Sequence, residues 1–102
     1  MDQEQEFKKA IHDFYRVYWE LQKHMELRSV THFSLYTDNY IEIWHYRGEV
    51  KEKLLLKVKV QKGEENAGIE CYKKAAELIK NILREQQKKG EAHGRVYTDH
   101  AG

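Results

Sequence analysis

The chain has 102 residues, of which 40% are hydrophobic and 34% are charged. This length and composition predict one soluble globular domain with a modest core, and exclude a disordered acidic chain. The longest uncharged apolar run, Leu54-Leu55-Leu56, is too short to cross a bilayer. With a net charge of +1, the chain as a whole attracts neither nucleic acid nor an anionic membrane.

The cysteine content and the N-terminus bear on the compartment. Cys71 is the only cysteine, so no internal disulfide forms, and a reducing environment is expected. The acidic start, Met1–Glu6, has no apolar stretch of the kind found in secretory signals. We therefore expect a cytoplasmic protein.

A first amphipathic helix is predicted from about Gln5 to Arg28. Its apolar stripe repeats at intervals of three and four residues and consists of Phe7, Ile11, Phe14, Tyr18, Leu21 and Met25. Trp19 lies roughly 120° from the centre of the stripe at 100° per residue. It is therefore either a rim residue or part of a second contact surface.

A β pattern begins in the segment 28–31 and alternates strictly from Phe33 to Val60, which predicts a three-stranded antiparallel meander with two different faces. The expected core face carries Phe33, Leu35, Ile41, Ile43, Leu54, Leu56, Val58 and Val60. The other face carries Tyr36, Tyr40, Trp44, Tyr46, Lys51, Lys53, Lys57 and Lys59. Large aromatics interleaved with lysines are typical of a surface that something covers.

The pairing of these strands follows from their turns. Gly48-Glu49 fits a two-residue hairpin loop. The pairs expected from this loop are Arg47 with Val50, His45 with Glu52, Ile43 with Leu54, Ile41 with Leu56, Tyr46 with Lys51, Trp44 with Lys53, and Tyr40 with Lys57. A two-residue turn at Asp38-Asn39 would set Leu35 opposite a glutamate, so an odd-length loop or a bulge is expected there, with Phe33 and Leu35 facing His45 and Ile43.

The final element is an amphipathic helix predicted from about Glu65 to Lys89, with Gly90 at the position of a left-handed cap. Its apolar stripe consists of Ile69, Tyr72, Ala76, Ile79 and Leu83. Residues 1–90 then form a single α+β domain, and residues 91–102 form a polar C-terminal tail. The element order is α-β-β-β-α. Both helical stripes need an apolar partner, so we expect both helices on the aliphatic face of the sheet, in two layers, with the aromatic and lysine-rich face outside.

This outer face suggests a non-enzymatic binding or regulatory protein that acts by protein–protein contact, with self-association as one form of it. The residues expected to carry the contact are Tyr36, Trp44, Tyr46, Lys53 and Leu55, with Trp44 as anchor and Trp19 as the candidate outside the sheet. A purely structural explanation also applies, because aromatics are favoured in strands and cross-strand pairs stabilise sheets. The alternative function is binding of RNA or single-stranded DNA by base stacking and lysine contacts.

A second argument for nucleic acid comes from a resemblance. The α-β-β-β-α order, with Lys73-Lys74-Ala75-Ala76 opening the last helix, resembles the double-stranded-RNA-binding domain family. The resemblance implies RNA contacts by Lys73, Lys74 and the Asp38-Asn39 loop. The chain departs from that family in having no Gly-Pro-His-like loop after the first strand and in having Glu77 where the family's motif continues with lysine. In general style, the chain is also similar to small inhibitor and accessory proteins of phages and other mobile elements.

No pattern of catalytic or metal-binding residues is found in the sequence. The six histidines include no i,i+4 pair and no accompanying cysteine pair, so no metal site is predicted. Cys71 lies near an apolar stripe and is expected to be a buried, inert thiol. We therefore expect no enzymatic activity, no cofactor and no small-molecule substrate.

Overall fold

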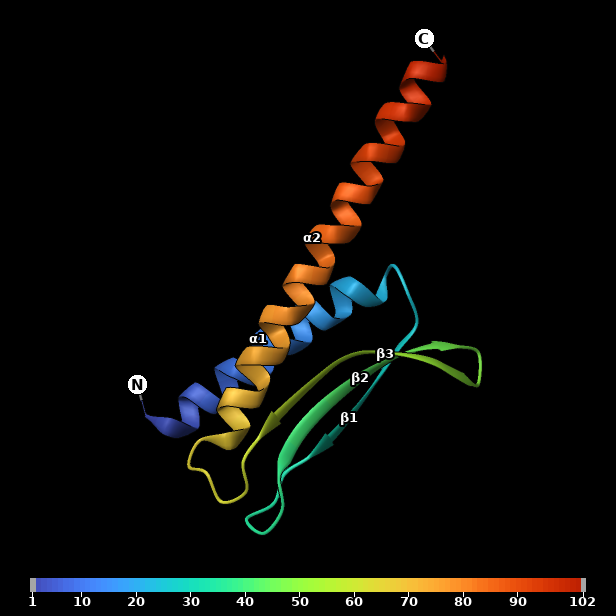
Figure 1. Cartoon of the computed structure of the whole chain (residues 1–102). Helices are drawn as coiled ribbons and strands as arrows, with labels where there is room; N and C mark the ends of the chain where they lie inside the picture. The colour runs from blue at the N-terminus through green and yellow to red at the C-terminus, as the bar shows by residue number, and fades with distance from the viewer. Residues whose placement is uncertain (1, 102) are drawn as a thin grey trace.

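The structure is a computed structural model that describes the backbone of residues 2–101 and the side chains of residues 2–88. Its elements are α1 (Gln3–Gln22), β1 (Leu27–His32), β2 (Asn39–Arg47), β3 (Val50–Val60) and α2 (Ala67–Ala101). The strands form an antiparallel meander in the order β1-β2-β3. The predicted α+β fold class and element order are confirmed (Figure 1).

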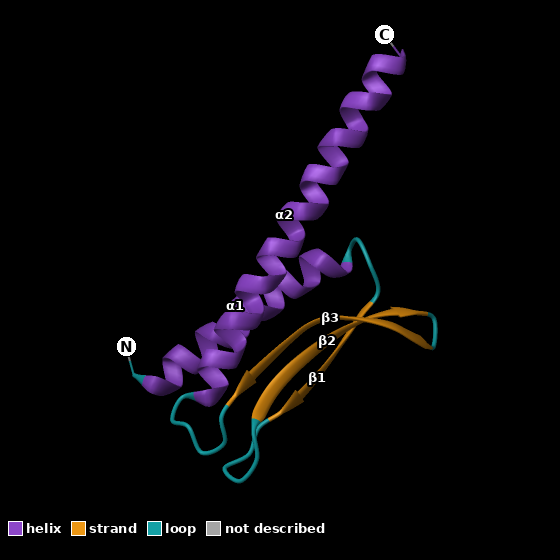
Figure 2. Ribbon diagram, viewed as in Figure 1, coloured by secondary structure: helices purple, strands orange, loops and turns teal. Residues whose placement is uncertain are grey.

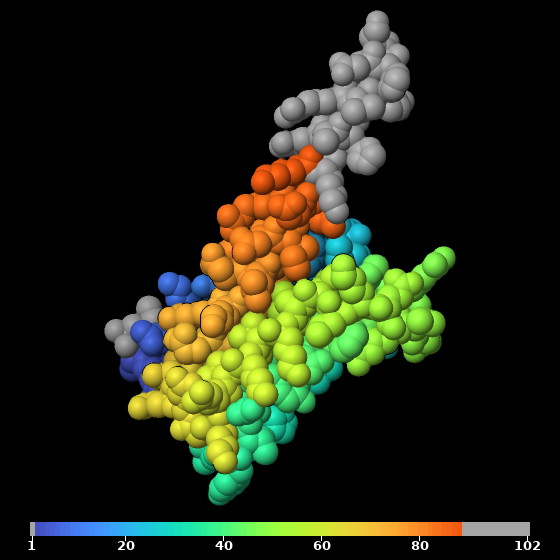
Figure 3. Space-filling view, in the orientation of Figure 1, coloured from blue at the N-terminus to red at the C-terminus, as the bar shows by residue number. Residues whose placement is uncertain are grey.

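The helices and the sheet form two layers, with both helices on the same face of the sheet (Figure 2). In the space-filling view the strands form one layer against α1 and α2 (Figure 3). The core between the layers consists of Ala10, Phe14, Val17, Tyr18, Leu21, Leu27, Ile41, Ile43, Leu56, Val58, Ile69, Cys71, Tyr72, Ala75, Ala76 and Ile79. It is therefore built from the two helical stripes and the aliphatic face of β2 and β3.

Helix α1 begins with a side-chain cap and ends earlier than predicted. The Asp2 carboxylate accepts a hydrogen bond from the Gln5 amide at 2.8 Å, which satisfies one of the free N–H groups of the first turn. The helix ends at Gln22, so its predicted end near Arg28 is wrong. The chain turns there because Leu27 is buried in the sheet opposite His45, and a continuing helix could not place it there.

Strand β1 ends at His32, and residues 33–38 form a loop, which corrects the prediction that Phe33 and Leu35 belong to the core face. Leu35 is 76% exposed and Tyr36 is 83% exposed. The Ser34 hydroxyl accepts hydrogen bonds from the amides of Tyr36 and Thr37, and these local bonds favour a turn over a strand. The expected odd-length connection is nevertheless found, because residues 33–39 separate the paired His32 and Tyr40.

The β2–β3 pairing starts as predicted and then shifts twice. Arg47 opposes Val50 and Tyr46 opposes Lys51, as expected. Register shifts between His45 and Tyr46 and between Ile43 and Trp44 each insert one extra residue in β3. The observed pairs beyond them are His45 with Lys53, Trp44 with Leu54, Ile43 with Leu56, Ile41 with Val58, and Tyr40 with Lys59. The predicted backbone pairs of His45 with Glu52, Ile43 with Leu54, Ile41 with Leu56, Trp44 with Lys53 and Tyr40 with Lys57 are therefore wrong, although the His45 and Glu52 side chains still lie 3.7 Å apart.

The two register shifts also exchange the faces of the sheet on which Leu54 and Leu55 were predicted to lie. Leu54 was expected in the core and Leu55 on the outer face, but Leu55 is half-buried against the core and Leu54 lies opposite Trp44. A bulge reverses the face of every residue beyond it, and a second bulge restores the original alternation. Leu56 and Val58 therefore still reach the core.

Helix α2 is longer than predicted. It begins at Ala67, directly after Asn66, whose φ of 66° lies in the left-handed region, and it continues through Gly90 to Ala101. The predicted helix end at Gly90 is therefore wrong. Side chains beyond Lys88 lie outside the described part of the chain, so the polar tail 91–102 stays a prediction.

Alanine substitutions of the three consecutive leucines would test the shifted register. Leu56 is 8% exposed and Leu54 is 38% exposed. Leu56→Ala should therefore lower the free energy of unfolding by about 2–5 kcal/mol, as for other buried leucines, and Leu54→Ala by much less. Leu55→Ala should fall between them. Urea denaturation of the three variants measures the order, and a larger loss for Leu54→Ala than for Leu56→Ala would contradict the structure.

Candidate functional site

The face of the sheet that points away from α1 and α2 is the candidate site, and we call it the outer face. The strand pairing assigns to it Arg28, Val30 and His32 of β1, Tyr40, Glu42, Trp44 and Tyr46 of β2, and Lys51, Leu54, Lys57 and Lys59 of β3. Within the described part of the chain, neither helix crosses this face (Figure 2). Its composition is basic and aromatic, although the whole chain is nearly neutral.

Three cations lie over three aromatic rings of the outer face. The Lys51 ammonium is 3.9 Å from the centre of the Trp44 ring, and the Arg28 guanidinium carbon is 4.3 Å from that of Tyr46. The Lys57 ammonium is 5.2 Å from the centre of the Tyr40 ring. All three distances lie within the range of attraction between a cation and a ring face. The aromatics therefore hold positive groups at defined positions on the surface.

A single acidic residue organises the middle of this arrangement. The indole N–H of Trp44 donates a hydrogen bond of 2.9 Å to the Glu42 carboxylate, which also forms an ion pair of 3.6 Å with Lys57. The Glu42 side chain is only 18% exposed, so this ion pair is less screened by solvent than a fully exposed one. Glu42 thereby fixes the orientation of both Trp44 and Lys57.

The two ends of the outer face are tied down by further polar contacts. At the hairpin end, the Arg28 guanidinium donates to the Gly48 carbonyl at 3.3 Å and lies 3.8 Å from the Glu49 carboxylate. At the opposite end, the His32 ring stacks on Tyr40, with centres 5.3 Å apart and planes 21° apart. The rings and cations of this face are thus held largely by contacts within the chain.

The structure does not gather the six residues predicted for binding into one surface. Trp44 and Tyr46 lie on the outer face, as expected. Lys53 opposes His45 and so belongs to the other side of the strand, and Leu55 packs against the core. Tyr36 lies in the β1–β2 loop, and Trp19 lies on α1.

Five residues of the outer face are absent from the predicted face, namely Arg28, Val30, His32, Glu42 and Leu54. For Arg28 and Val30 the sequence does carry a signal, since the β pattern begins in segment 28–31. The predicted first strand runs on into residues 33–36, and its predicted outer face therefore carries Tyr36 instead of Arg28 and Val30. The position of Leu54 depends on the bulges, which have no clear signature in the sequence.

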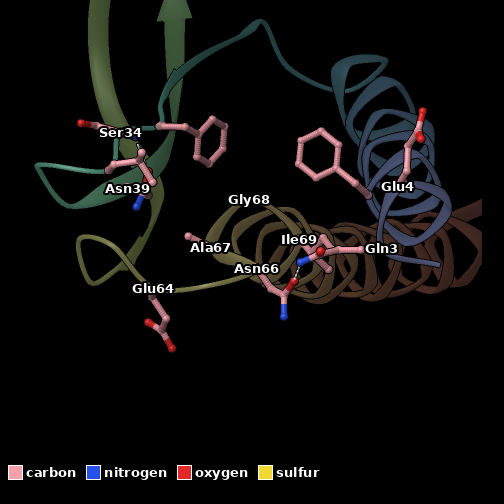
Figure 4. A pocket seen from close by; sticks show the side chains of 12 residues that line it. Gln3, Glu4, Ser34, Asn39, Glu64, Asn66, Ala67, Gly68 and Ile69 are labelled. Carbon is pink, nitrogen blue, oxygen red and sulfur yellow. Dashed lines mark hydrogen bonds between the residues drawn. The ribbon is translucent and has the colours of Figure 1, made fainter.

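A pocket lies elsewhere, between the starts of both helices and the β1–β2 loop. It has a volume of about 680 Å³, and its lining includes Phe7, Phe33, Ile69, Asn39 and Gly68 (Figure 4). The Asn39 amide nitrogen has no hydrogen-bond partner among the described residues, but it is also inaccessible to solvent, so it offers no donor to a molecule in the pocket. Two other polar side chains of the lining, Gln3 and Asn66, are hydrogen-bonded to each other.

Buried titratable groups occur in the core but do not form a reactive set. Burial raises the pKa of the Cys71 thiol and those of the Tyr18 and Tyr72 hydroxyls. A thiol with a raised pKa is a poor nucleophile at neutral pH. Within the described residues, no group of three or more His, Cys, Asp or Glu side chains is placed to hold a metal ion, and no helix is long and apolar enough to cross a membrane.

Comparisons of the chain with protein-family models, with curated proteins and with solved structures found no match. The resemblance to double-stranded-RNA-binding domains therefore rests on the element order and on Lys73-Lys74 alone. In the structure, these two lysines line separate clefts of mixed charge. The cleft of Lys73 also contains Glu6, Glu77, Lys9 and Lys80, and that of Lys74 also contains Glu64, Glu70 and Lys59.

Substitution of two lysines would test the contacts of Trp44. Lys51→Ala removes the cation over the ring and should lower the free energy of unfolding by about 0.5–1 kcal/mol, with a change in indole fluorescence. Lys53→Ala is the matched control, since Lys53 was expected opposite Trp44 but does not lie there. It should stay within about 0.5 kcal/mol of wild type. A larger effect for Lys53→Ala would favour the unshifted register.

An ion pair at the end of β3 should make stability depend on pH. The Asp38 carboxylate lies 3.0 Å from the Lys59 ammonium and accepts a hydrogen bond from the Lys62 amide at 3.1 Å. The hydrogen bond to Lys59 is the main reason that the Asp38 pKa is lowered from its usual value of 3.8. A lowered carboxyl pKa stabilises the fold above its unfolded-state value, and this contribution is lost as the pH falls through the folded-state value.

Asp38→Asn should therefore be less stable than wild type at neutral pH, and the difference should shrink as the pH falls below 3.8. Urea denaturation across this pH range measures the difference. Glu65→Gln is the control, because it removes an exposed carboxylate that has no ion pair among residues 2–88. A difference for Asp38→Asn that is the same at all pH values would show that the ion pair is not its cause.

Proposed function

We propose that this protein is a non-enzymatic binding protein that regulates an acidic protein partner by covering part of its surface. The contact is made by the outer face. The observation that supports it is the set of three cations, Arg28, Lys51 and Lys57, held over aromatic rings on a face that neither helix covers.

The chemistry of the outer face favours carboxylates as the groups recognised. Cations that are already held in place lose little conformational freedom when a partner binds, so more of the interaction energy contributes to affinity. The same face carries the apolar side chains of Val30 and Leu54, both exposed, which supply area that a partner can bury. An acidic surface with an apolar centre is complementary to this pattern.

Nucleic acid binding by the same face is the second candidate function. The cations over the rings and the position of Glu42 favour it less than binding of an acidic protein. Base stacking needs a free ring face, but Trp44, Tyr46 and Tyr40 each have a cation over the ring. Glu42 in the centre of the face would also repel phosphate.

We propose that the small domain acts by occupying the surface of its partner, without catalysing a reaction. Small inhibitor and accessory proteins, which the composition resembles in general style, act in this way.

Selection from a displayed random peptide library would test the proposal. Peptides rich in Asp and Glu around an apolar residue should be enriched on the wild-type protein. Trp44→Ala should weaken the selected peptides by about 2 kcal/mol or more if Trp44 is the anchor. Lys51→Glu should also weaken them, whereas Lys53→Glu, on the other side of the strand, should have little effect. Thermal unfolding of each variant confirms that its fold is retained.

Two outcomes would argue against the proposal. Peptides that bind all four proteins equally would show that the outer face is not the contact surface. Tight binding of single-stranded DNA or duplex RNA, falling steeply with salt and lost in Lys51→Glu, would favour the nucleic acid function instead.

A further inference from the structure

We propose that two copies of this protein pair through their β1 strands, so that the two sheets join into one continuous antiparallel sheet. β1 is one edge of the sheet, because it pairs only with β2 in the order β1-β2-β3.

The direction of the β1 backbone groups follows from one hydrogen bond. The Tyr46 amide donates to the Glu26 carbonyl at 2.9 Å, in the same register that pairs Leu27 with His45. In an antiparallel ladder, pairs that exchange hydrogen bonds alternate with pairs that do not. The N–H and C=O groups of Arg28, Val30 and His32 therefore point toward β2. Those of Leu27, Ser29 and Thr31 point away from it, toward the open edge.

The other edge of the sheet is protected against pairing and β1 is not. β3 carries four lysines, at positions 51, 53, 57 and 59, and two register shifts, all of which hinder pairing with another strand. β1 has no lysine, no proline and no register shift along its six residues. Its one charged side chain, Arg28, is engaged by Tyr46 and Glu49. β1 is thus a regular strand whose outward hydrogen-bonding groups are open to another strand.

Helix α1 adds an aromatic surface beside this edge. Helix α2 packs against β3 and β2, which leaves α1 above the β1 side of the sheet, where Leu27 joins the buried cluster of Tyr18 and Leu21. The flank of α1 that faces α2 carries Ala10 and Asp13, which line the cleft between the helices. Tyr15 is roughly 200° around the helix from Asp13, at 100° per residue, and therefore points away from α2.

Trp19 follows Tyr15 by one helical turn and lies on the same flank. Trp19 is 57% exposed and Tyr15 is 37% exposed on the helix side of the edge, whereas Val30 at the middle of β1 is 46% exposed on the outer face. Large exposed apolar side chains that lie together, as Tyr15 and Trp19 do, are typical of an interaction site. An occupant of the β1 edge would thus bury aromatic surface on the helix side as well as form backbone hydrogen bonds.

A second copy fits both features. With a two-fold axis at Val30, Ser29 of each copy opposes Thr31 of the other, so that their outward N–H and C=O groups pair with one another. Val30 meets Val30 of the second copy on the outer face, and no two carboxylates or lysines of the strands are opposed. The α1 flanks carrying Tyr15 and Trp19 then face each other above the joined strands. The same patch serves on both copies, as a two-fold dimer requires.

Proline substitutions distinguish the β1 residues whose N–H points toward the open edge from those whose N–H points toward β2. Thr31→Pro removes an outward N–H and leaves the pairing with β2 intact, since edge strands accept proline where the N–H faces outward. The full chain should change from the mass of two copies to that of one in light scattering, with its fold retained by circular dichroism. Val30→Pro is the matched control, because it removes an N–H that points toward β2 and should lower the unfolding temperature.

Two more measurements make the result specific. Hydrogen exchange of the Ser29 and Thr31 amides should become slower as the concentration of wild-type protein rises. Trp19→Ser should weaken dimerisation by about 30-fold or more, as expected for an interface anchor. Trp44→Ala, on the outer face, should leave the dimer unchanged.

The proposal is overturned if the wild-type protein has the mass of one chain at all concentrations and its Ser29 and Thr31 amides exchange rapidly. It is also overturned if the protein is a dimer that Trp44→Ala dissociates and Thr31→Pro does not, because the outer face would then be the interface. A failure of the peptide selection on the outer face leaves these expectations for the edge unchanged.

Discussion

The structure depends on the burial of one face of a small sheet. Ile41 and Ile43 in the central strand are fully buried, and both helices must cover them and their neighbours to remove their own apolar stripes from water. A three-stranded sheet has room for two helices only if they lie side by side. The outer face is consequently left without cover from either helix, and α1 is placed toward the β1 edge with one aromatic flank still exposed.

The two shifts in β3 adapt a long strand to this burial. A single extra residue would have turned Leu56 and Val58 away from the helices, whereas two extra residues keep them in the core. The change of face is confined to the hairpin end of β3, where Leu54 points to the outer face and not to the core. The shifts also determine which lysine meets which ring, because they set Leu54 rather than Lys53 opposite Trp44 and leave Lys51 over the indole. The chemistry of the outer face thus depends on a packing requirement of the opposite face.

The exposed surfaces differ in what they can recognise. On the outer face, rings and acids of the chain itself hold the cations, so the surface is organised before any partner binds and its attraction is mainly electrostatic. The β1 edge offers backbone hydrogen bonds and loosely covered aromatic area, which suit an extended strand. Joining two copies through the edge would place two outer faces side by side. An acidic partner with repeated sites would then gain affinity from contacting both at once.

The sequence by itself determined the fold class, the existence of both helices and the start of the hairpin at Gly48. It also determined the aromatic and basic character of the outer face of β2. Each of these follows from local periodicity and turn chemistry. It did not determine the ends of α1 and β1, the position of Tyr36 in a loop or the exchange of Leu54 and Leu55. These depend on contacts between residues far apart in the chain, such as Leu27 with His45 and Leu56 with Ile43. A period-two pattern records which residues alternate but not where an extra residue enters, and only the packing of the helices against the sheet decides that.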